Sequence, residues 1–147
     1  MVTIADAVRF VPIPPPAPNE VIVDNADPGT SSVGTWTLST LLPAQRWGVD
    51  YAWSNTVGNS FTFPATLVPG TYAVYGWWTA SSNRYTAVPY EIRDGATLLG
   101  TATVNQRLNG GTWNLLGTYT FTGSASVTVV TAGAYTIADA VKFVPVP

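Results

Sequence analysis

Hydrophobic and polar residues alternate along most of the chain, which is the pattern of β-strands with one buried face. In residues 71–79, for example, Tyr72 and Val74 are expected on one face of a strand and the residues between them on the other. Turn-forming residues interrupt the pattern about every 8–12 residues, as in β-sandwiches. The expected strands are residues 21–23, 35–39, 47–53, 59–63, 71–79, 86–93, 97–104, 113–121, 125–131 and 136–144. The pattern predicts an all-β fold, a jelly-roll-like antiparallel β-sandwich.

One twelve-residue segment occurs twice, at residues 3–14 and 136–147, with ten identical positions out of twelve. Its changes, Arg9 to Lys142 and Ile13 to Val146, keep the charge and the apolar character. The separation of 133 residues is the length of a whole domain, much longer than a solenoid repeat. Residues 1–11 are therefore interpreted as the closing strand of a preceding or neighbouring unit.

Prolines set the domain boundaries. Residues 12–18 contain five prolines, which favour an extended polyproline II linker without ladder hydrogen bonds. We assign residues 12–19 to this linker and residues 20–147 to the sandwich domain. The alternative is a proline-rich surface loop within one domain.

If residues 136–144 fill the last position of the sandwich, the first copy has no position in its own domain. Three arrangements follow: it closes a preceding domain of a longer chain, it joins the sheet of a second chain, or it adds to an edge of its own sheet. The first two predict a thread-like assembly. The residues expected in this assembly strand are Thr3, Ile4, Asp6, Val8 and Phe10, with Ile137, Asp139, Val141 and Phe143 in the second copy.

Charge and composition exclude several functions. Only 10% of the residues are charged and the net charge is −2, so no basic surface for nucleic acid is expected. No apolar run is long enough to cross a membrane. The chain has no His and no Cys, which removes the commonest general base and the usual zinc ligands. No pair of acidic residues suggests hydrolysis, and we predict a non-catalytic protein without a cofactor.

Two groups of acidic residues need an explanation. Asp24, Asn25 and Asp27 form an oxygen-rich turn that either binds Ca²⁺ or, as we favour, caps its own backbone as an Asx-turn. Asp139 is expected among apolar side chains, where an unpaired carboxylate is costly. We expect Arg84, Arg107 or backbone amides to satisfy it, so that Asp139 fixes the register of the last strand.

Aromatic residues supply the candidate site for a carbohydrate ligand. Rings of Trp and Tyr stack on the C–H faces of sugars, and neighbouring amides or cations fix the orientation. The adjacent residues Trp77 and Trp78 must point to opposite faces of their strand, so at most one is expected in the core, whereas Trp113 is assigned to the core. The alternative is that the aromatics simply fill the sandwich. The candidate glycan platform consists of Trp47, Tyr51, Trp53, Trp77, Asn83 and Arg84.

Five groups of residues form a combined pattern, namely 23–29 with 34–36, 70–77, 82–86 with 89–90, 104–117 and 135–141. Together they resemble the golvesin C-terminal-like domain, a module of secreted bacterial enzymes, including xanthan lyases, and of surface proteins. The resemblance covers about residues 21–144. It implies a jelly-roll β-sandwich, an extracellular or cell-surface location, and a non-catalytic role that is often taken to be polysaccharide binding.

Two functions follow from these observations. The leading expectation is a structural repeat that self-associates head-to-tail into an extracellular fibre or stalk through the duplicated strand and the linker. The alternative is a carbohydrate-binding module that anchors a secreted enzyme or a cell to polysaccharide. The two are compatible, because a fibre of binding modules gains avidity.

Overall fold

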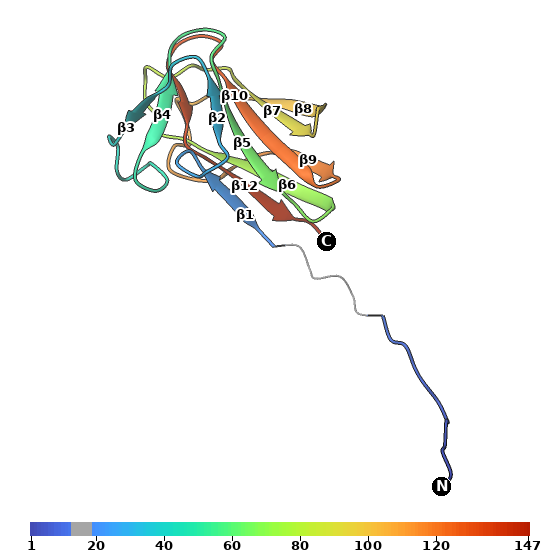
Figure 1. Cartoon of the computed structure of the whole chain (residues 1–147). Helices are drawn as coiled ribbons and strands as arrows, with labels where there is room; N and C mark the ends of the chain where they lie inside the picture. The colour runs from blue at the N-terminus through green and yellow to red at the C-terminus, as the bar shows by residue number, and fades with distance from the viewer. Residues whose placement is uncertain (13–18) are drawn as a thin grey trace.

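The computed structural model describes residues 1–12 and 19–147. Residues 19–147 form an antiparallel β-sandwich (Figure 1), as the alternating pattern predicts. Its strands are β1 (Val21–Asp24), β2 (Ser31–Val33), β3 (Thr37–Ser39), β4 (Tyr51–Ser54), β5 (Ser60–Thr66), β6 (Gly70–Trp77), β7 (Val88–Asp94), β8 (Thr97–Val104), β9 (Asn114–Phe121), β10 (Ser124–Val130), β11 (Thr136–Ala138) and β12 (Ala140–Pro145). None of the described residues forms a helix that could cross a membrane.

Two large sheets form the layers of the sandwich, and a small sheet lies at one end (Figure 1). The first sheet has the order β1-β12-β6-β9, and the second has the order β2-β5-β10-β7-β8. The small sheet has the order β11-β4-β3. Because β11 and β12 are consecutive segments of one chain, the last part of the chain ties the small sheet to the first large sheet.

The core consists of the inward side chains of both large sheets. Tyr72 and Val74 of β6 are fully buried, whereas Ala73 and Tyr75 are partly exposed, as expected from the sequence. Phe63 of β5 packs into the same cluster from the opposite sheet. Burial of large apolar side chains of this kind is the main stabilising contribution, about 1.5–3 kcal/mol for each one.

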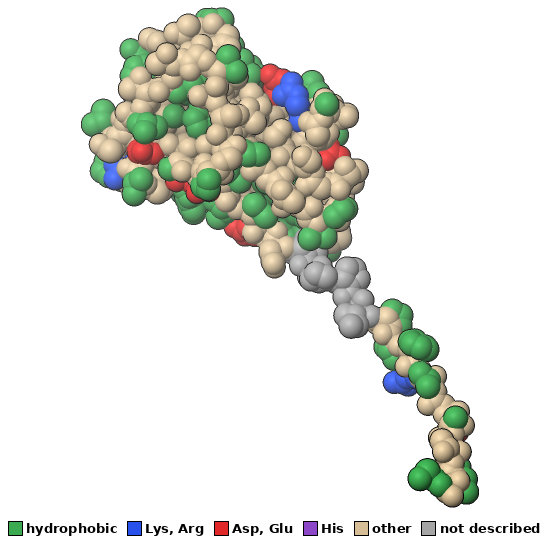
Figure 2. Space-filling model, viewed as in Figure 1, with side chains coloured by type: hydrophobic (Ala, Val, Ile, Leu, Met, Phe, Trp, Pro, Cys, Tyr) green, Lys and Arg blue, Asp and Glu red, His purple; other side chains and the backbone are tan. Residues whose placement is uncertain are grey.

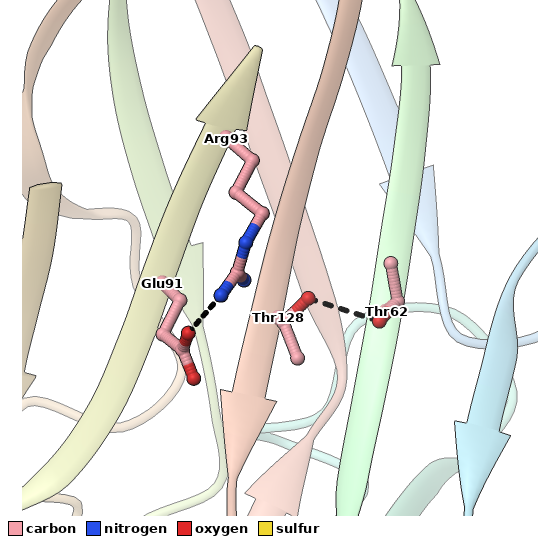
Figure 3. Close-up of polar contacts among 4 residues, drawn as sticks. All are labelled: Thr62, Glu91, Arg93 and Thr128. Atoms are coloured by element: carbon pink, nitrogen blue, oxygen red, sulfur yellow. Dashed lines mark hydrogen bonds and ion pairs between the residues drawn. The ribbon is translucent and has the colours of Figure 1, made fainter. Parts of the chain in front are cut away.

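The outer face of the second large sheet is polar. Figure 3 shows Glu91 and Arg93 of β7 paired along the strand, and Thr62 of β5 bonded across to Thr128 of β10 with 2.9 Å between the hydroxyl oxygens. Residues two apart in a strand share a face, which places the Glu91 and Arg93 side chains side by side. Such cross-strand and same-face pairs fix the register and leave the apolar side chains for the core.

Local structure departs from the sequence prediction at several places. Strand β2 was not expected, and the expected strand 47–53 begins only at Tyr51. The hairpin loop between β7 and β8 consists of Gly95 and Ala96, and only Gly95 has a positive φ, of 58°. The Asp94-Gly95 pair predicts a type I′ turn, which needs positive φ at both loop residues. That prediction is wrong, and positive φ at the first position alone is typical of type II′. The expected last strand, residues 136–144, is divided at Asp139 into β11 and β12.

Residues 1–12, which we call the tail, form no strand and lie apart from the sandwich (Figure 1). The tail was expected to be a strand, but no strand of this chain pairs with it, and an unpaired segment has no ladder. The predicted linker falls largely on residues 13–18, which lie outside the described part of the chain.

Candidate functional site

A pocket with a volume of about 220 Å³ opens at the end of the sandwich that carries the small sheet. Its size suits one sugar ring rather than a long chain, since pockets for larger ligands usually occupy about 300–1,000 Å³. The lining residues are Ser39, Leu41, Tyr51, Trp53, Asn83, Arg84 and Tyr135. Four of these, Tyr51, Trp53, Asn83 and Arg84, belong to the platform predicted from the sequence.

Strand β4 supplies the aromatic floor. Tyr51 and Trp53 are two residues apart, so both side chains point to the same face of the strand. Tyr51 is buried, and Trp53 is partly exposed. The ring of Trp53 packs against that of Tyr135, with 5.1 Å between centroids and a tilt of 53°. Two adjoining rings of this kind offer an apolar surface on which a sugar can stack.

Arg84 supplies the polar wall, although only 6% of the residue is exposed. Its guanidinium donates to the Thr79 carbonyl and hydroxyl, both at 3.1 Å, and to Asn83 Oδ1 at 2.7 Å. It also lies over the Tyr51 ring, 5.9 Å from the centroid. Three of its five N–H groups are used in this way. Among the described residues no carboxylate lies within ion-pair distance of it.

Backbone contacts hold the loop that carries Arg84 against the segment before β11. Tyr85 N donates to the Tyr135 carbonyl at 2.9 Å, and Arg107 Nε donates to the Arg84 carbonyl at 2.8 Å. Gln106, which is completely buried, makes hydrogen bonds to both the N–H and the carbonyl of Ile137, at 2.8 and 2.9 Å. These bonds make the pocket a fixed feature of the fold, because its walls are tied to a core strand.

The two remaining platform residues, Trp47 and Trp77, lie elsewhere. With Trp113 they form a tryptophan cluster in which each pair of ring centroids is 5.0–5.2 Å apart. Trp77 Nε1 donates to the Gln45 carbonyl at 2.6 Å, and the Lys142 ammonium lies 4.7 Å from the Trp113 ring centroid. Trp113 is therefore at the partly exposed outer side of the first sheet, and its assignment to the core is wrong. Of the adjacent residues Trp77 and Trp78, Trp78 is the one that lies in the core.

Asp139 is almost completely buried, as expected, and the Trp47 N–H donates to one of its oxygens at 3.0 Å. A backbone amide thus satisfies one of its two oxygens, whereas the side chains of Arg84 and Arg107 are bonded elsewhere. Its other oxygen, Oδ1, is buried and has no hydrogen-bond partner. Burial raises the pKa of Asp139 to about 8, an effect that the Trp47 N–H reduces.

The turn of Asp24, Asn25 and Asp27 closes on itself. Asp24 Oδ1 accepts from the Asn25 N–H and Asp27 Oδ2 accepts from the Asp24 N–H, both at 2.9 Å. The side chains therefore cap backbone N–H groups of their own turn, but neither bond is the contact to the residue two positions on that defines an Asx-turn. Burial raises the pKa of Asp24 to about 6, and the nearby charges of Asp27 and Asp50 act in the same direction. No group of three or more acidic residues within the described segments is arranged to hold a metal.

A calcium site at this turn therefore stays a prediction. The one feature in its favour is that Asn25 Oδ1 is buried without a partner, as is Asp139 Oδ1. Oxygen donors of this kind suit a hard cation. A calcium titration followed by thermal unfolding tests it, since a cation that binds only the folded chain raises Tm.

Three pocket residues, Ser39, Leu41 and Tyr135, were not identified from the sequence. Tyr135 had a usable signal, because it directly precedes the duplicated segment and therefore had to lie beside the last strand. Ser39 and Leu41 had none. They reach the pocket because β3 pairs with β4, with Ser39 opposite Tyr51, and a short polar strand of three residues does not predict that pairing.

The comparisons with known proteins match nearly the whole sandwich. A family model described as the Golvesin C-terminal domain matches residues 21–145. A xanthan lyase of Bacillus sp. (strain GL1) is 39% identical over 92% of this chain, and the match covers 16% of that protein. The structure of a Paenibacillus xanthan lyase matches 88% of this chain with a TM-score of 0.78 and 42% identity, over 13% of its own length. The chain thus spans only a small part of these relatives.

A more distant similarity is to a domain of matching size. The family 35 carbohydrate binding module from Clostridium thermocellum matches 84% of this chain and 98% of its own length, with a TM-score of 0.60. Its identity of 15% is too low to transfer residues. The similarity shows that this chain and that module share a fold.

Proposed function

Because the chain belongs to the Golvesin C-terminal domain family, we propose that it is a non-catalytic carbohydrate-binding module of an extracellular, polysaccharide-degrading protein. The observation that carries the proposal is the pocket, in which the adjoining, tilted rings of Trp53 and Tyr135 lie beside the polar side chains of Asn83 and Arg84. The names of the relatives, xanthan lyases, and of the structural neighbour, a carbohydrate binding module, support the same reading. Assembly into a fibre or stalk, the leading expectation from the sequence, has no support among them.

The pocket would bind one sugar residue of a polysaccharide. The apolar face of the sugar would lie on Trp53 and Tyr135, and the exposed amide of Asn83 would bind its hydroxyl groups. The rest of the polysaccharide chain would run past the open mouth of the pocket.

The charge of the pocket indicates the type of sugar. Arg84 is buried with no carboxylate partner among the described residues, and two of its N–H groups remain free of protein acceptors there. A buried cation without a counter-ion is costly, and a bound carboxylate would relieve that cost. We infer that a sugar with an acidic substituent binds better than a neutral one.

Affinity electrophoresis tests this function. Migration of the protein is compared in gels that contain no polysaccharide, xanthan as the acidic polymer named in the relatives, or dextran as a neutral polymer. We expect retardation in xanthan, its loss in Trp53→Ala, and weaker retardation in dextran. Trp113→Ala is the matched control, because it removes an indole outside the pocket. Equal migration of the unchanged protein in all gels contradicts the proposal.

A further inference from the structure

The tail has the sequence of a core segment but lies in solvent. Ile4, Val8 and Phe10 are 79%, 83% and 91% exposed, and Figure 2 shows hydrophobic side chains along the tail. Their counterparts in the second copy, Ile137, Val141 and Phe143, are each 0% exposed. We call that second copy, β11, Asp139 and β12, the closing segment. The tail therefore carries the side chains that fill one particular position in this sandwich.

That position is internal. β12 lies between β1 and β6, with Val141 opposite Val23 on one side and opposite Gly76 on the other. β11 pairs with β4. Asp139, which lies between β11 and β12 in the chain, accepts a hydrogen bond from the Trp47 N–H. The tail therefore cannot add beside the closing segment. It can occupy this position only where a closing segment is displaced or absent.

The two sequence differences between the copies do not prevent the tail from occupying the position of a closing segment. Lys142 lies over the rings of Tyr75 and Trp113, at 5.1 and 4.7 Å from their centroids, and Arg9 would replace it there. Arginine stacks on aromatic rings at least as well as lysine. Val146, where the first copy has Ile13, is exposed, so one more methylene group at this position would extend into solvent.

We propose that the tail of one chain can close the sandwich of a second copy by occupying the position of its closing segment. The interaction surface is the groove between β1 and β6 that β12 otherwise fills, together with the side of β4 that otherwise pairs with β11, and its occupant is residues 3–11 of the other copy. This property is independent of the carbohydrate-binding pocket.

The partner is a second copy rather than the same chain. To close its own sandwich, the tail would have to place Phe10 opposite Val21, as Phe143 is now. Residues 11–20 would then form the connecting reversal, and five of these ten residues are prolines, a composition that disfavours a compact loop.

In the unchanged protein the chain's own closing segment has the advantage. It is attached to the sandwich, so its effective concentration is in the millimolar range, whereas a tail from another chain competes at its bulk concentration. The exchange is therefore tested with a chain in which both copies are disabled. Phe10→Asp/Phe143→Asp places a charge at the phenylalanine of each copy, a position that is 0% exposed in the closing segment, and is designed to leave the groove vacant.

This double variant is refolded from urea together with an equimolar amount of the unchanged protein, and the products are separated by size-exclusion chromatography and weighed by native mass spectrometry. We expect a species that contains one chain of each kind, because the free tail of the unchanged protein fills the vacant groove. The matched donor control is Phe10→Asp, which differs only in the tail and should give no such species.

Two results overturn the proposal: the double variant stays unfolded beside the unchanged protein, or the Phe10→Asp donor captures it equally well. The single variant Phe143→Asp distinguishes closure by the tail of another chain from closure by the chain's own tail. Oligomers linked by their tails support exchange between chains. A folded monomer shows that the chain's own tail returns to the groove, and an unfolded chain shows that no tail fills it, so both contradict the proposal.

Discussion

Asp139 carries an unusual charge state for an aspartate. Its pKa of about 8 in the folded chain lies above the value of about 3.9 expected when the chain is unfolded. The folded state thus binds the proton more tightly, and this stabilisation is complete below about pH 4 and is lost as the pH rises to about 8. The charged groups that act on it are Asp24 and Asp50, which raise its pKa, and Arg46, which lowers it.

We therefore predict that the protein becomes less stable between pH 5 and pH 8, by up to about 1.4 kcal/mol per pH unit from this one proton. Asp139→Asn mimics the neutral acid and should flatten that slope while matching the unchanged protein at pH 5. Urea unfolding at a series of pH values provides the measurement. A slope that survives in Asp139→Asn would assign the effect to another group, with Asp24 as the first candidate because its pKa is also raised.

Arg84 holds the polar wall of the pocket through geometry as well as charge. Arg84→Lys keeps the charge but cannot reach Thr79 and Asn83 at once, because an ammonium lacks the planar fork of the guanidinium. We expect a loss of about 1–3 kcal/mol in the free energy of unfolding, from a buried group left with unsatisfied partners. Arg93→Lys, at the partly exposed pair on the outer face, is the control and should change stability by less than about 1 kcal/mol.

Single residues were predicted best where one rule decided their position. Alternation along β6 placed Tyr72 and Val74 inside, and adjacency placed Trp77 and Trp78 on opposite faces. The Trp47, Trp77 and Trp113 contacts depend on two loops that meet outside the first sheet, and no local pattern encodes that meeting. This is why the six-residue platform is divided in the structure between the pocket and the tryptophan cluster.

At the scale of elements, the loop from β10 to β11 positions Tyr135 and is constrained by Gly133. A Cβ at Gly133 would lie 2.0 Å from Cε1 of the Tyr85 ring, far inside van der Waals contact. We expect Gly133→Ala to displace the loop and lower the stability by about 1–3 kcal/mol. Ala132→Ser, at the exposed neighbouring position, serves as the control. Thermal unfolding of the two variants measures the difference, and equal Tm values would contradict this role of Gly133.

Most strands were predictable from alternation, and the exceptions have physical reasons. β2 is three exposed residues, Ser31–Val33, whose only partner is β5, so it has no buried face to produce a pattern. The division of the last strand arises because Ala138 pairs with β4 and Ala140 with β1 and β6. The chain changes sheets at Asp139, and a continuous apolar sequence does not reveal such a change.

At the scale of the whole molecule, the tail contributes nothing to the fold of its own chain. Its residues are exposed and belong to no strand of the sandwich. We predict that deletion of residues 1–11 leaves Tm within about 1 °C of the unchanged protein, because no buried surface is lost. Differential scanning calorimetry gives the comparison. A substantially lower Tm would show that the tail packs on the sandwich in solution.

The overall architecture was accessible from the sequence, whereas the position of the tail was not. Duplication identified which residues resemble the closing segment, but the internal position of β12 between β1 and β6 follows only from the pairing of distant strands. The same is true of the pocket, whose walls come from β3, β4, the loop after β6 and the segment before β11. A site whose residues come from four distant segments cannot be predicted from local sequence patterns.

The central claim, that the pocket binds a sugar, is tested most directly by following the six tryptophan indole N–H signals by NMR during a titration with xanthan oligosaccharides. Trp53 is the only tryptophan that lines the described pocket, so its signal should shift in a saturable way, while the signals of Trp47, Trp77 and Trp113 stay in place. Shifts confined to that tryptophan cluster, or no shift at any indole, would contradict the account.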